Sequence, residues 1–149
     1  MSSPKINIRQ ANLSDLVWIN EQYSSIGFLP SVFDREFILI AEVADEKAGI
    51  GRIVFLEEGH VELGGIFVLP SFRKKGIARL IVKDLIYKNP YPTKSIWCIP
   101  FENLKHFYGE FGFKTLSQKL EDLPKLISEK MRWCAKKITR PVVLMQKKD

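Results

Sequence analysis

The sequence predicts a mixed α/β fold in which a central, mostly antiparallel, seven-stranded sheet is flanked by helices. Between positions 37 and 68, three apolar runs are separated by short polar turns, which is typical of an antiparallel meander. Between positions 61 and 99, an apolar run, a helical pattern and another apolar run follow one another, and such a crossover makes its two strands parallel. The 149 residues contain no repeat and no linker, so we expect a single domain over residues 1–149.

An N-terminal strand and a helix are expected first. Ile6 and Ile8 alternate with polar residues, as in a half-buried strand. Asn12 is followed three residues later by Asp15, which resembles a capping box at the start of a helix. A short second helix is expected over 31–36. The apolar face expected for the first helix consists of Leu13, Leu16 and Val17.

The other elements follow from apolar runs and from glycine or proline breaks. The meander strands are expected at 37–43, 50–56 and 61–68, with turns at 44–47 and 57–60. The remaining elements are a helix over 77–87, a strand over 95–99, a helix over 103–111 closed by Gly112, a strand over 113–116, a helix from Asp122 and Pro124 to Cys134, and a strand over 142–145.

Composition narrows the class of protein. The chain is 46% hydrophobic and 27% charged, as in an ordinary soluble globule, and no apolar run approaches the roughly 18 residues that cross a bilayer. We expect no signal peptide and no membrane contact. Cys98 and Cys134 lack the spacing of metal ligands, so no metal is expected and the thiols should be reduced in the cytoplasm.

The net charge of +6 leaves two interpretations open. A basic chain suits an anionic partner, but it also suits a solvated surface around a highly charged cofactor. No motif that reads nucleic acid is recognisable, so the cofactor interpretation is favoured and a nucleic-acid partner is not expected.

One stretch breaks a local rule. Arg73, Lys74 and Lys75 stand at the N-terminus of the expected helix 77–87, where the helix dipole already presents positive charge. A bound phosphate removes the conflict, because free backbone N–H groups and the cations would bind it together while Gly76 allows close approach. A basic loop without a ligand is the plain alternative.

The loop also carries a family resemblance. Arg73-x-x-Gly76-x-Ala78 resembles the Gln/Arg-x-x-Gly-x-Gly/Ala signature of GNAT-type N-acetyltransferases. The resemblance implies the GNAT fold, with acetyl-CoA as cofactor and strands 4 and 5 splayed apart beside Gly64-Gly65. It also implies that backbone groups of the fourth strand pair with the pantetheine arm, while the loop binds the pyrophosphate. The cofactor-binding residues so implied are Ile66, Phe67, Val68, Arg73, Lys74, Lys75, Gly76, Ile77 and Ala78.

Acetyl transfer to an amine requires that the amine lose its proton, because an alkylammonium with a pKa of about 10.4 is almost wholly charged at neutral pH. Glu62 lies on the expected fourth strand, where many members of the family carry a catalytic base. The resemblance therefore implies that Glu62 accepts the proton, directly or through water. An outward-facing strand carboxylate without catalytic role is the alternative.

The segment from Asn103 to Phe113 carries the third part of the resemblance. Phe107-Tyr108 followed by Gly112-Phe113 resembles the family's Phe-Tyr-x-x-x-Gly-Phe segment, which makes Tyr108 the hydrogen-bond donor to the thioester sulfur. A core tyrosine is the alternative, because Tyr108 shares an apolar helix face. Asn103 matches a position that contacts pantetheine in relatives.

No covalent intermediate is expected from these residues. Cys98 lies on an apolar strand without an evident activating base, so we expect it in the core. His60 and His106 are expected at the surface, with His60 in a turn.

The acceptor is less defined. In the family, the regions that correspond to 27–33 and 121–139 shape the acceptor pocket, and the second weakly resembles the acetyltransferase domain of N-acetylglutamate synthases. A basic wall there would suit an acidic small molecule such as an amino acid, although a peptide amine is also an acceptor of this class and the same residues would equally serve as a homodimer surface. Two other functions remain: a catalytically silent acyl-CoA-binding regulator, and a basic nucleic-acid-binding module.

Overall fold

The computed structural model describes residues 5–117 and 122–148. Its backbone contacts divide the chain into two compact units. Unit 1 holds the residues up to Val54 together with Gly65–Pro90, and unit 2 holds Phe55–Gly64 together with the residues from Tyr91 onward.

The strands of unit 1 form an antiparallel ladder. β1 (Ile6–Gln10) pairs with β2 (Glu36–Val43), and β2 pairs with β3 (Glu46–Glu57). Between β2 and β3 the chain turns at Ala44 and Asp45, whose φ values of 50° and 66° are those of a type I′ hairpin. The turn expected over 44–47 is therefore too long, because Glu46 and Lys47 already belong to β3.

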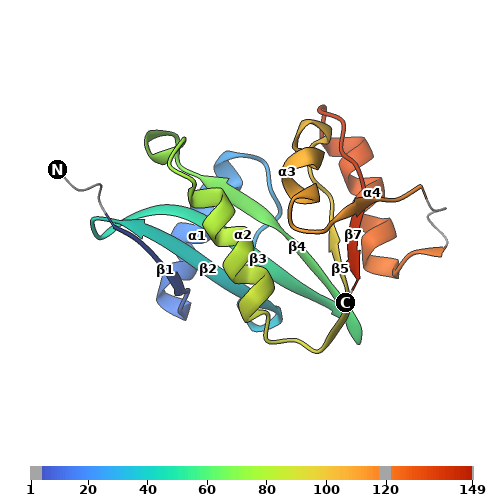
Figure 1. Cartoon of the computed structure of the whole chain (residues 1–149), viewed down its shortest axis with the longest axis horizontal. Helices are drawn as coiled ribbons and strands as arrows, with labels where there is room; N and C mark the ends of the chain where they lie inside the picture. The colour runs from blue at the N-terminus through green and yellow to red at the C-terminus, as the bar shows by residue number, and fades with distance from the viewer. Residues whose placement is uncertain (1–4, 118–121, 149) are drawn as a thin grey trace. The chain divides into compact units, whose positions relative to one another are not determined.

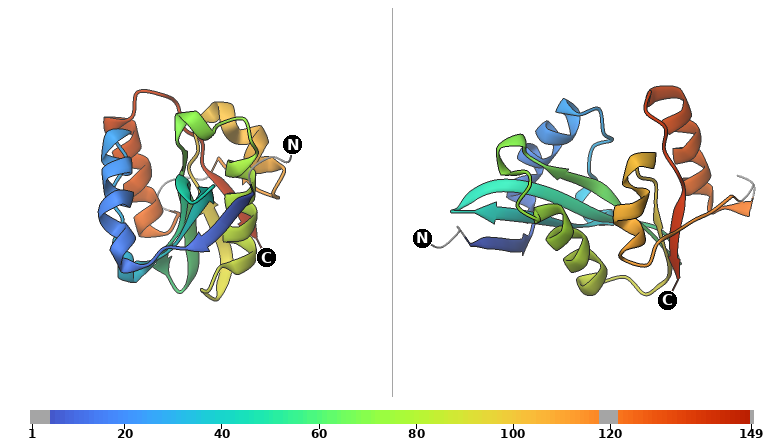
Figure 2. Two further views of the ribbon diagram at one scale, coloured as in Figure 1. Left: turned by 90° about the vertical axis from the view of Figure 1, so that its left-hand side faces the viewer. Right: turned by 45° about the horizontal axis from the view of Figure 1, so that its top comes forward.

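Two helices cover the strands of unit 1 on opposite faces (Figures 1 and 2). On one face, α1 (Leu16–Ser25) packs its Ile19 and Tyr23 into a buried cluster with residues of β2 and β3. On the other face, α2 (Ile77–Lys88) lies close to the backbone of β3. A Cβ atom at Gly51 would lie only 2.4 Å from Ile81 Cγ2, so this close approach depends on glycine.

Two expectations for unit 1 are wrong. The side chains expected to form the apolar face of the first helix include Leu13 and Val17, which are 66% and 71% exposed. The chain enters the helix through a 3₁₀ turn (Leu13–Asp15), whose tighter period shifts the inward face to Ile19 and Tyr23. The expected helix over 31–36 is a single 3₁₀ turn, Phe33–Arg35.

The capping box is confirmed, because the Asn12 N–H donates to Asp15 Oδ2 at 2.9 Å.

Unit 2 contains the parallel pair. β4 (Gly59–Val68) pairs with β5 (Thr93–Cys98) from Gly59 to Glu62, and the last register pair is Glu62 with Trp97. β5 then pairs antiparallel with β7 (Met145–Lys148), which pairs antiparallel with β6 (Lys114–Thr115). The helices of this unit are α3 (Lys105–Gly109) and α4 (Lys125–Lys137).

Several boundaries in unit 2 differ from those expected. The last strand is Met145–Lys148 rather than 142–145, because Val142 forms an isolated bridge with Phe101 and the Val143 N–H donates to the Pro100 carbonyl. These valines therefore follow the segment after β5, and only the residues beyond them reach β5 itself. The helix expected from Asp122 begins after Pro124 and extends to Lys137.

The segment around Tyr108 is also divided differently. A 3₁₀ turn (Glu102–Leu104) precedes α3, which ends at Gly109, and the sixth strand keeps only two of its four expected residues. Gly112 has a φ of 96°, so the predicted left-handed glycine is confirmed.

Together the strands form a seven-stranded sheet in the order β1-β2-β3-β4-β5-β7-β6, and β3 and β4 contribute residues to both units. The predicted mixed α/β class, with seven strands, one parallel pair and flanking helices, is confirmed.

Candidate active site

The cationic loop before α2 lies in unit 1. After a 3₁₀ turn (Pro70–Phe72), Arg73 is extended and its Nε donates to the Val68 carbonyl at 2.9 Å. Lys74 then adopts a left-handed conformation with a φ of 65°, and Gly76 does the same with a φ of 78°. A lysine in this region costs about 1 kcal/mol or more relative to ordinary backbone. The strain is the kind that a functional loop retains.

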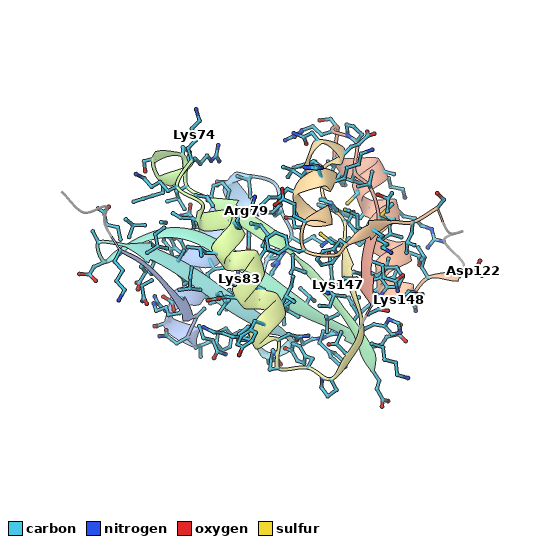
Figure 3. The ribbon with its side chains drawn as sticks, viewed as in Figure 1. Lys74, Arg79, Lys83, Asp122, Lys147 and Lys148 are labelled. Atoms are coloured by element: carbon cyan, nitrogen blue, oxygen red, sulfur yellow. The ribbon has the colours of Figure 1, made fainter. Side chains whose placement is uncertain are left out.

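The loop places exposed cations beside the N-terminus of α2. The first N–H groups of α2 have no partner within the helix, and the first helical bond begins at Leu80, whose N–H donates to the Gly76 carbonyl at 3.2 Å. Arg73, Lys74 and Lys75 are all exposed beside it. Figure 3 shows Lys74 extending outward from the loop, whereas Lys83 lies further along α2. N–H groups and cations around one helix end suit a phosphate or diphosphate.

The strand before this loop bends at a glycine. Gly65 has a φ of 61°, and a Cβ there would lie 2.6 Å from Tyr23 Oη and 2.8 Å from Arg52 Nε. Tyr23 donates its hydroxyl to the Gly65 carbonyl at 2.7 Å, which fixes the bend to helix α1. Burial raises the pKa of Tyr23, so the hydroxyl remains a donor. The expected distortion at Gly64-Gly65 is present, and no local pattern indicates that Tyr23 holds it.

A buried arginine holds the segment expected to shape the acceptor pocket. Arg52 is 5% exposed, and its two terminal nitrogens donate to Ser31 Oγ at 2.7 Å and to the Leu29 carbonyl at 2.9 Å. Its guanidinium also lies 4.3 Å from the centre of the Tyr23 ring and 3.6 Å from a Glu36 carboxylate oxygen. The loop around 27–33 is thus attached to β3 in unit 1. Sequence analysis missed this arginine, although a cation inside an apolar strand run was a visible signal.

The proposed base lies in unit 2. Glu62 is 4% exposed, so its interpretation as an outward-facing carboxylate is wrong. Its Oε2 accepts a hydrogen bond from the Lys130 ammonium of α4, and the two groups form an ion pair. A buried carboxylate requires such a partner, because an unpaired charge in the interior is strongly unfavourable. The catalytic role of Glu62 stays a prediction.

Two thiols interact with this ion pair. Cys98 and Cys134 are both buried and free. Burial raises the pKa of each thiol, the negative charge of Glu62 raises it as well, and the positive charge of Lys130 lowers it without cancelling the rise. Neither sulfur is therefore prepared to act as a nucleophile, and the expectation that Cys98 is a core residue is confirmed.

Tyr108 is placed by α3 and is 5% exposed. Phe107 and Phe113 pack edge-on against its ring, with centroids 5.0 and 6.1 Å away. Burial raises its pKa well above the ordinary value, and interaction with Cys98 raises it further. Its phenol therefore remains protonated and able to donate. The core interpretation is correct as to burial, and the proposed contact with sulfur stays a prediction.

Asn103 lies in the turn before α3, at the edge of a shallow groove of about 330 Å³ lined by Glu102, Asn103, Arg140 and Pro141. Its Oδ1 accepts a hydrogen bond from Arg140 at 3.0 Å, and the Arg140 guanidinium stacks 3.9 Å from the Phe101 ring centre. Its contact with pantetheine stays a prediction.

The histidines differ from each other. His60 lies in β4, so the expected turn position is wrong; its side chain is half-buried, and its Nδ1 accepts a hydrogen bond from Trp97 Nε1 at 3.1 Å. The His106 side chain is 95% exposed, as expected. Within residues 5–117 and 122–148, no three His, Cys, Asp or Glu residues gather as a metal site requires. The helices of the described chain include none that is long and apolar enough to span a membrane.

The predicted site residues are divided between the two units. Unit 1 holds the loop residues from Arg73 to Ala78 and the strand residues Ile66–Val68, and unit 2 holds Glu62, Tyr108 and Asn103. Glu121, where the expected acceptor region 121–139 begins, lies outside the described residues, and α4 occupies most of the remainder.

Known proteins share this fold. The structure resembles Rv2747 from Mycobacterium tuberculosis in complex with CoA and NLQ (TM-score 0.76, 17% identity, 96% of this chain and 99% of that chain). It also resembles a GNAT family acetyltransferase from Elizabethkingia anophelis with acetyl-CoA bound (TM-score 0.67, 15% identity, 97% of this chain and 98% of that chain). A third similar structure is N-acetylglutamate synthase from Neisseria gonorrhoeae complexed with coenzyme A and N-acetyl-glutamate (TM-score 0.72, 18% identity, 99% of this chain). The present chain spans only 36% of that synthase.

At these identities the likeness concerns the fold, and no curated protein sequence matches the chain. The sequence itself matches the family described as "Acetyltransferase (GNAT) domain" over residues 34–115. This stretch is more than half of the chain and contains the cationic loop, Glu62 and Tyr108. The chain therefore belongs to the GNAT acetyltransferase family.

Proposed function

We propose that this chain is an acetyl-CoA-dependent N-acetyltransferase that moves the acetyl group to a primary amine, and that its two units act together as one domain. The observation that carries the proposal is the loop before α2, where three exposed cations surround a helix N-terminus and two residues have left-handed backbone. The membership of the GNAT family and the resemblance to structures with CoA or acetyl-CoA bound support the same cofactor.

In this proposal, the residues from Arg73 to Ala78 bind the pyrophosphate through backbone N–H groups and positive charge. The backbone of Ile66–Val68 pairs with the pantetheine arm, and Asn103 contacts it as well. Acetyl-CoA supplies the activated acyl group when bound. Glu62 takes the proton of the acceptor ammonium, directly or through water, and Tyr108 donates a hydrogen bond to the sulfur as it becomes a thiolate.

Direct attack without a covalent enzyme intermediate is the mechanism that these residues favour. Cys98 and Cys134 are buried and have raised pKa values, so they offer no thiolate to carry the acetyl group. A main-chain N–H near Val68 would meet the developing oxyanion.

The acceptor class is a small amine such as an amino acid. Two structural relatives hold a second ligand beside CoA. The synthase from Neisseria gonorrhoeae holds N-acetyl-glutamate, an amino-acid derivative, and Rv2747 holds the ligand NLQ. The buried Arg52 holds the loop around 27–33, and the basic helix α4 would attract an acidic acceptor. A homodimer through α4 stays a prediction that sedimentation of the purified protein would test.

Calorimetry with acetyl-CoA and coenzyme A tests the cofactor site, and a panel of amines assayed for thiol release tests turnover. Two variants sharpen the binding test, because Lys74→Ala and Lys83→Ala remove the same charge from the loop and from the exposed side of α2. One charge contact near the surface is worth about 1 kcal/mol, so Lys74→Ala should weaken binding about fivefold. Lys83→Ala should leave the affinity nearly unchanged. Absence of binding by the wild-type chain would refute the proposal.

One observation favours a second candidate, a catalytically silent acyl-CoA-binding regulator. Glu62 is already paired with Lys130, so the proposed base is occupied. This alternative predicts acetyl-CoA binding without thiol release on any amine. A nucleic-acid-binding module would instead bind RNA or DNA in a salt-dependent way and would show no thermal shift with acetyl-CoA.

A further inference from the structure

The ion pair between Glu62 and Lys130 joins two elements of unit 2 that are 68 positions apart in the sequence. The Lys130 ammonium of α4 donates a hydrogen bond to Glu62 Oε2 on β4. The Glu62 side chain is 5% exposed, whereas that of Lys130 is 24% exposed. The carboxylate is therefore enclosed, whereas the lysine side chain that contacts it is partly exposed.

This pair has a plain structural role, because it neutralises a buried carboxylate. The head group of Lys130 is a primary alkylammonium, which is the functional group of the acceptor under the proposed function. It contacts the carboxylate that would take the acceptor's proton under the proposed function. Lys130 is thus held where an amine that gives its proton directly to Glu62 would lie.

Lys125 on the same helix shows the contrast. Its side chain is 85% exposed, and a carboxylate oxygen of Glu129 that lies 4.0 Å away belongs to a side chain that is itself 49% exposed. Both residues are lysines of α4, and only the more enclosed one contacts the proposed base. Simple chemical acetylation follows exposure and would favour Lys125, whereas catalysed transfer would favour Lys130.

We propose that Lys130 is an acetyl acceptor of this site, so that the chain acetylates itself there when no free amine occupies Glu62. The inference rests on the proposed function, because acetyl-CoA is the donor. Cys98 and Cys134 do not compete as nucleophiles, because both thiols are buried.

Lys130 gives one ammonium proton to Glu62, which passes it to water. The nitrogen lone pair then attacks the thioester carbonyl carbon, the C–N bond forms, and the C–S bond breaks with its electron pair on sulfur. The nitrogen loses its second proton to the thiolate. The products are N-acetyl-Lys130, coenzyme A as the thiol, and one proton in solution.

The test uses the wild-type chain incubated with acetyl-CoA alone, followed by intact mass measurement and peptide mapping. We expect one acetyl group, on Lys130, at a rate independent of protein concentration, because the acceptor belongs to the same molecule. Lys130 should react about tenfold or more faster than Lys125 despite its lower exposure. Glu62→Gln should slow the reaction about a hundredfold, as removal of a general base does.

Lys130→Arg keeps the positive charge and removes the acceptor, so it should abolish the modification, while the matched Lys125→Arg should have no effect on it. Acetylation that tracks exposure, or that survives Glu62→Gln unchanged, would overturn the inference. So would an unmodified Lys130 in a chain that binds acetyl-CoA and acetylates a free amine, and in that case the proposed function would stand. Absence of acetyl-CoA binding would defeat both.

Discussion

Substitution of Gly65 tests whether the bend in β4 depends on the contact between this glycine and Tyr23. The φ of 61° at Gly65 is left-handed, which costs about 1–2 kcal/mol for a residue with a Cβ. The added Cβ in Gly65→Ala would also lie 2.6 Å from Tyr23 Oη, closer than real Cβ contacts. Relief requires that Tyr23 move and give up its 2.7 Å hydrogen bond to the Gly65 carbonyl, which costs about 1–3 kcal/mol for a buried group.

The sum predicts that Gly65→Ala lowers the free energy of unfolding by about 2–5 kcal/mol, a large share of the total for a chain of this size. Urea denaturation measures this change. Gly27→Ala is the matched control, because Gly27 has a φ of 75° and nothing lies within 4 Å of its added Cβ. It should lose only the backbone part, about 1 kcal/mol.

A double-mutant cycle separates the steric part from the backbone part. In a Tyr23→Phe background the closest atom is absent, so the additional cost of Gly65→Ala should fall by about 1 kcal/mol. Equal losses at Gly27 and Gly65, or no coupling between Tyr23 and Gly65, would refute the argument that the bend in β4 is fixed by this contact. The bend precedes Ile66–Val68, so Gly65→Ala should also weaken acetyl-CoA binding in calorimetry.

Three further predictions concern chemistry and pH. Glu62→Gln should lower kcat/KM about a hundredfold at neutral pH, with a loss that shrinks at high pH as the amine deprotonates unaided; a pH profile of unchanged shape would exclude Glu62 as the base. Tyr108→Phe should retain acetyl-CoA affinity in calorimetry but slow thiol release about tenfold or more, and equal rates would remove Tyr108 from the mechanism. The hydrogen bond from Arg9 holds the pKa of Asp15 well below its ordinary value, so the stability it contributes is present above about pH 4 and lost as the pH falls. Asp15→Asn should flatten this acid dependence by about 1–3 kcal/mol in urea titrations at several pH values, whereas an unchanged slope would contradict it.

The sequence predicted best what local patterns determine. The strand expected at 37–43 is β2 with one added residue, and the helix expected at 77–87 is α2 with one added residue. The strand is a nearly continuous apolar run, the helix has a clear apolar period, and both have clear ends. The predicted bounds of the last strand are wrong, because a β-branched run indicates an extended chain but not the strand with which it pairs. Val142 pairs with Phe101 and not with β5.

The contacts that define the candidate site could not be predicted in the same way. Glu62 and Lys130 meet across 68 positions, and Tyr23 reaches the Gly65 carbonyl across 42. Both contacts depend on where a helix packs on a sheet, and no local pattern contains that information. The burial of Glu62 was missed for this reason, because a carboxylate on a strand normally faces water unless a cation is brought to it.

Lys130 has a consequence for the choice of acceptor that does not depend on whether it is ever acetylated. It is a tethered amine, so under the proposed function it competes at Glu62 with every incoming amine, at an effective concentration on the order of millimolar or higher. A molecule that offers an amine and nothing else would lose this competition. A metabolite with a second group that binds the protein would displace Lys130 from Glu62. Lys130 would thereby select against simple amines.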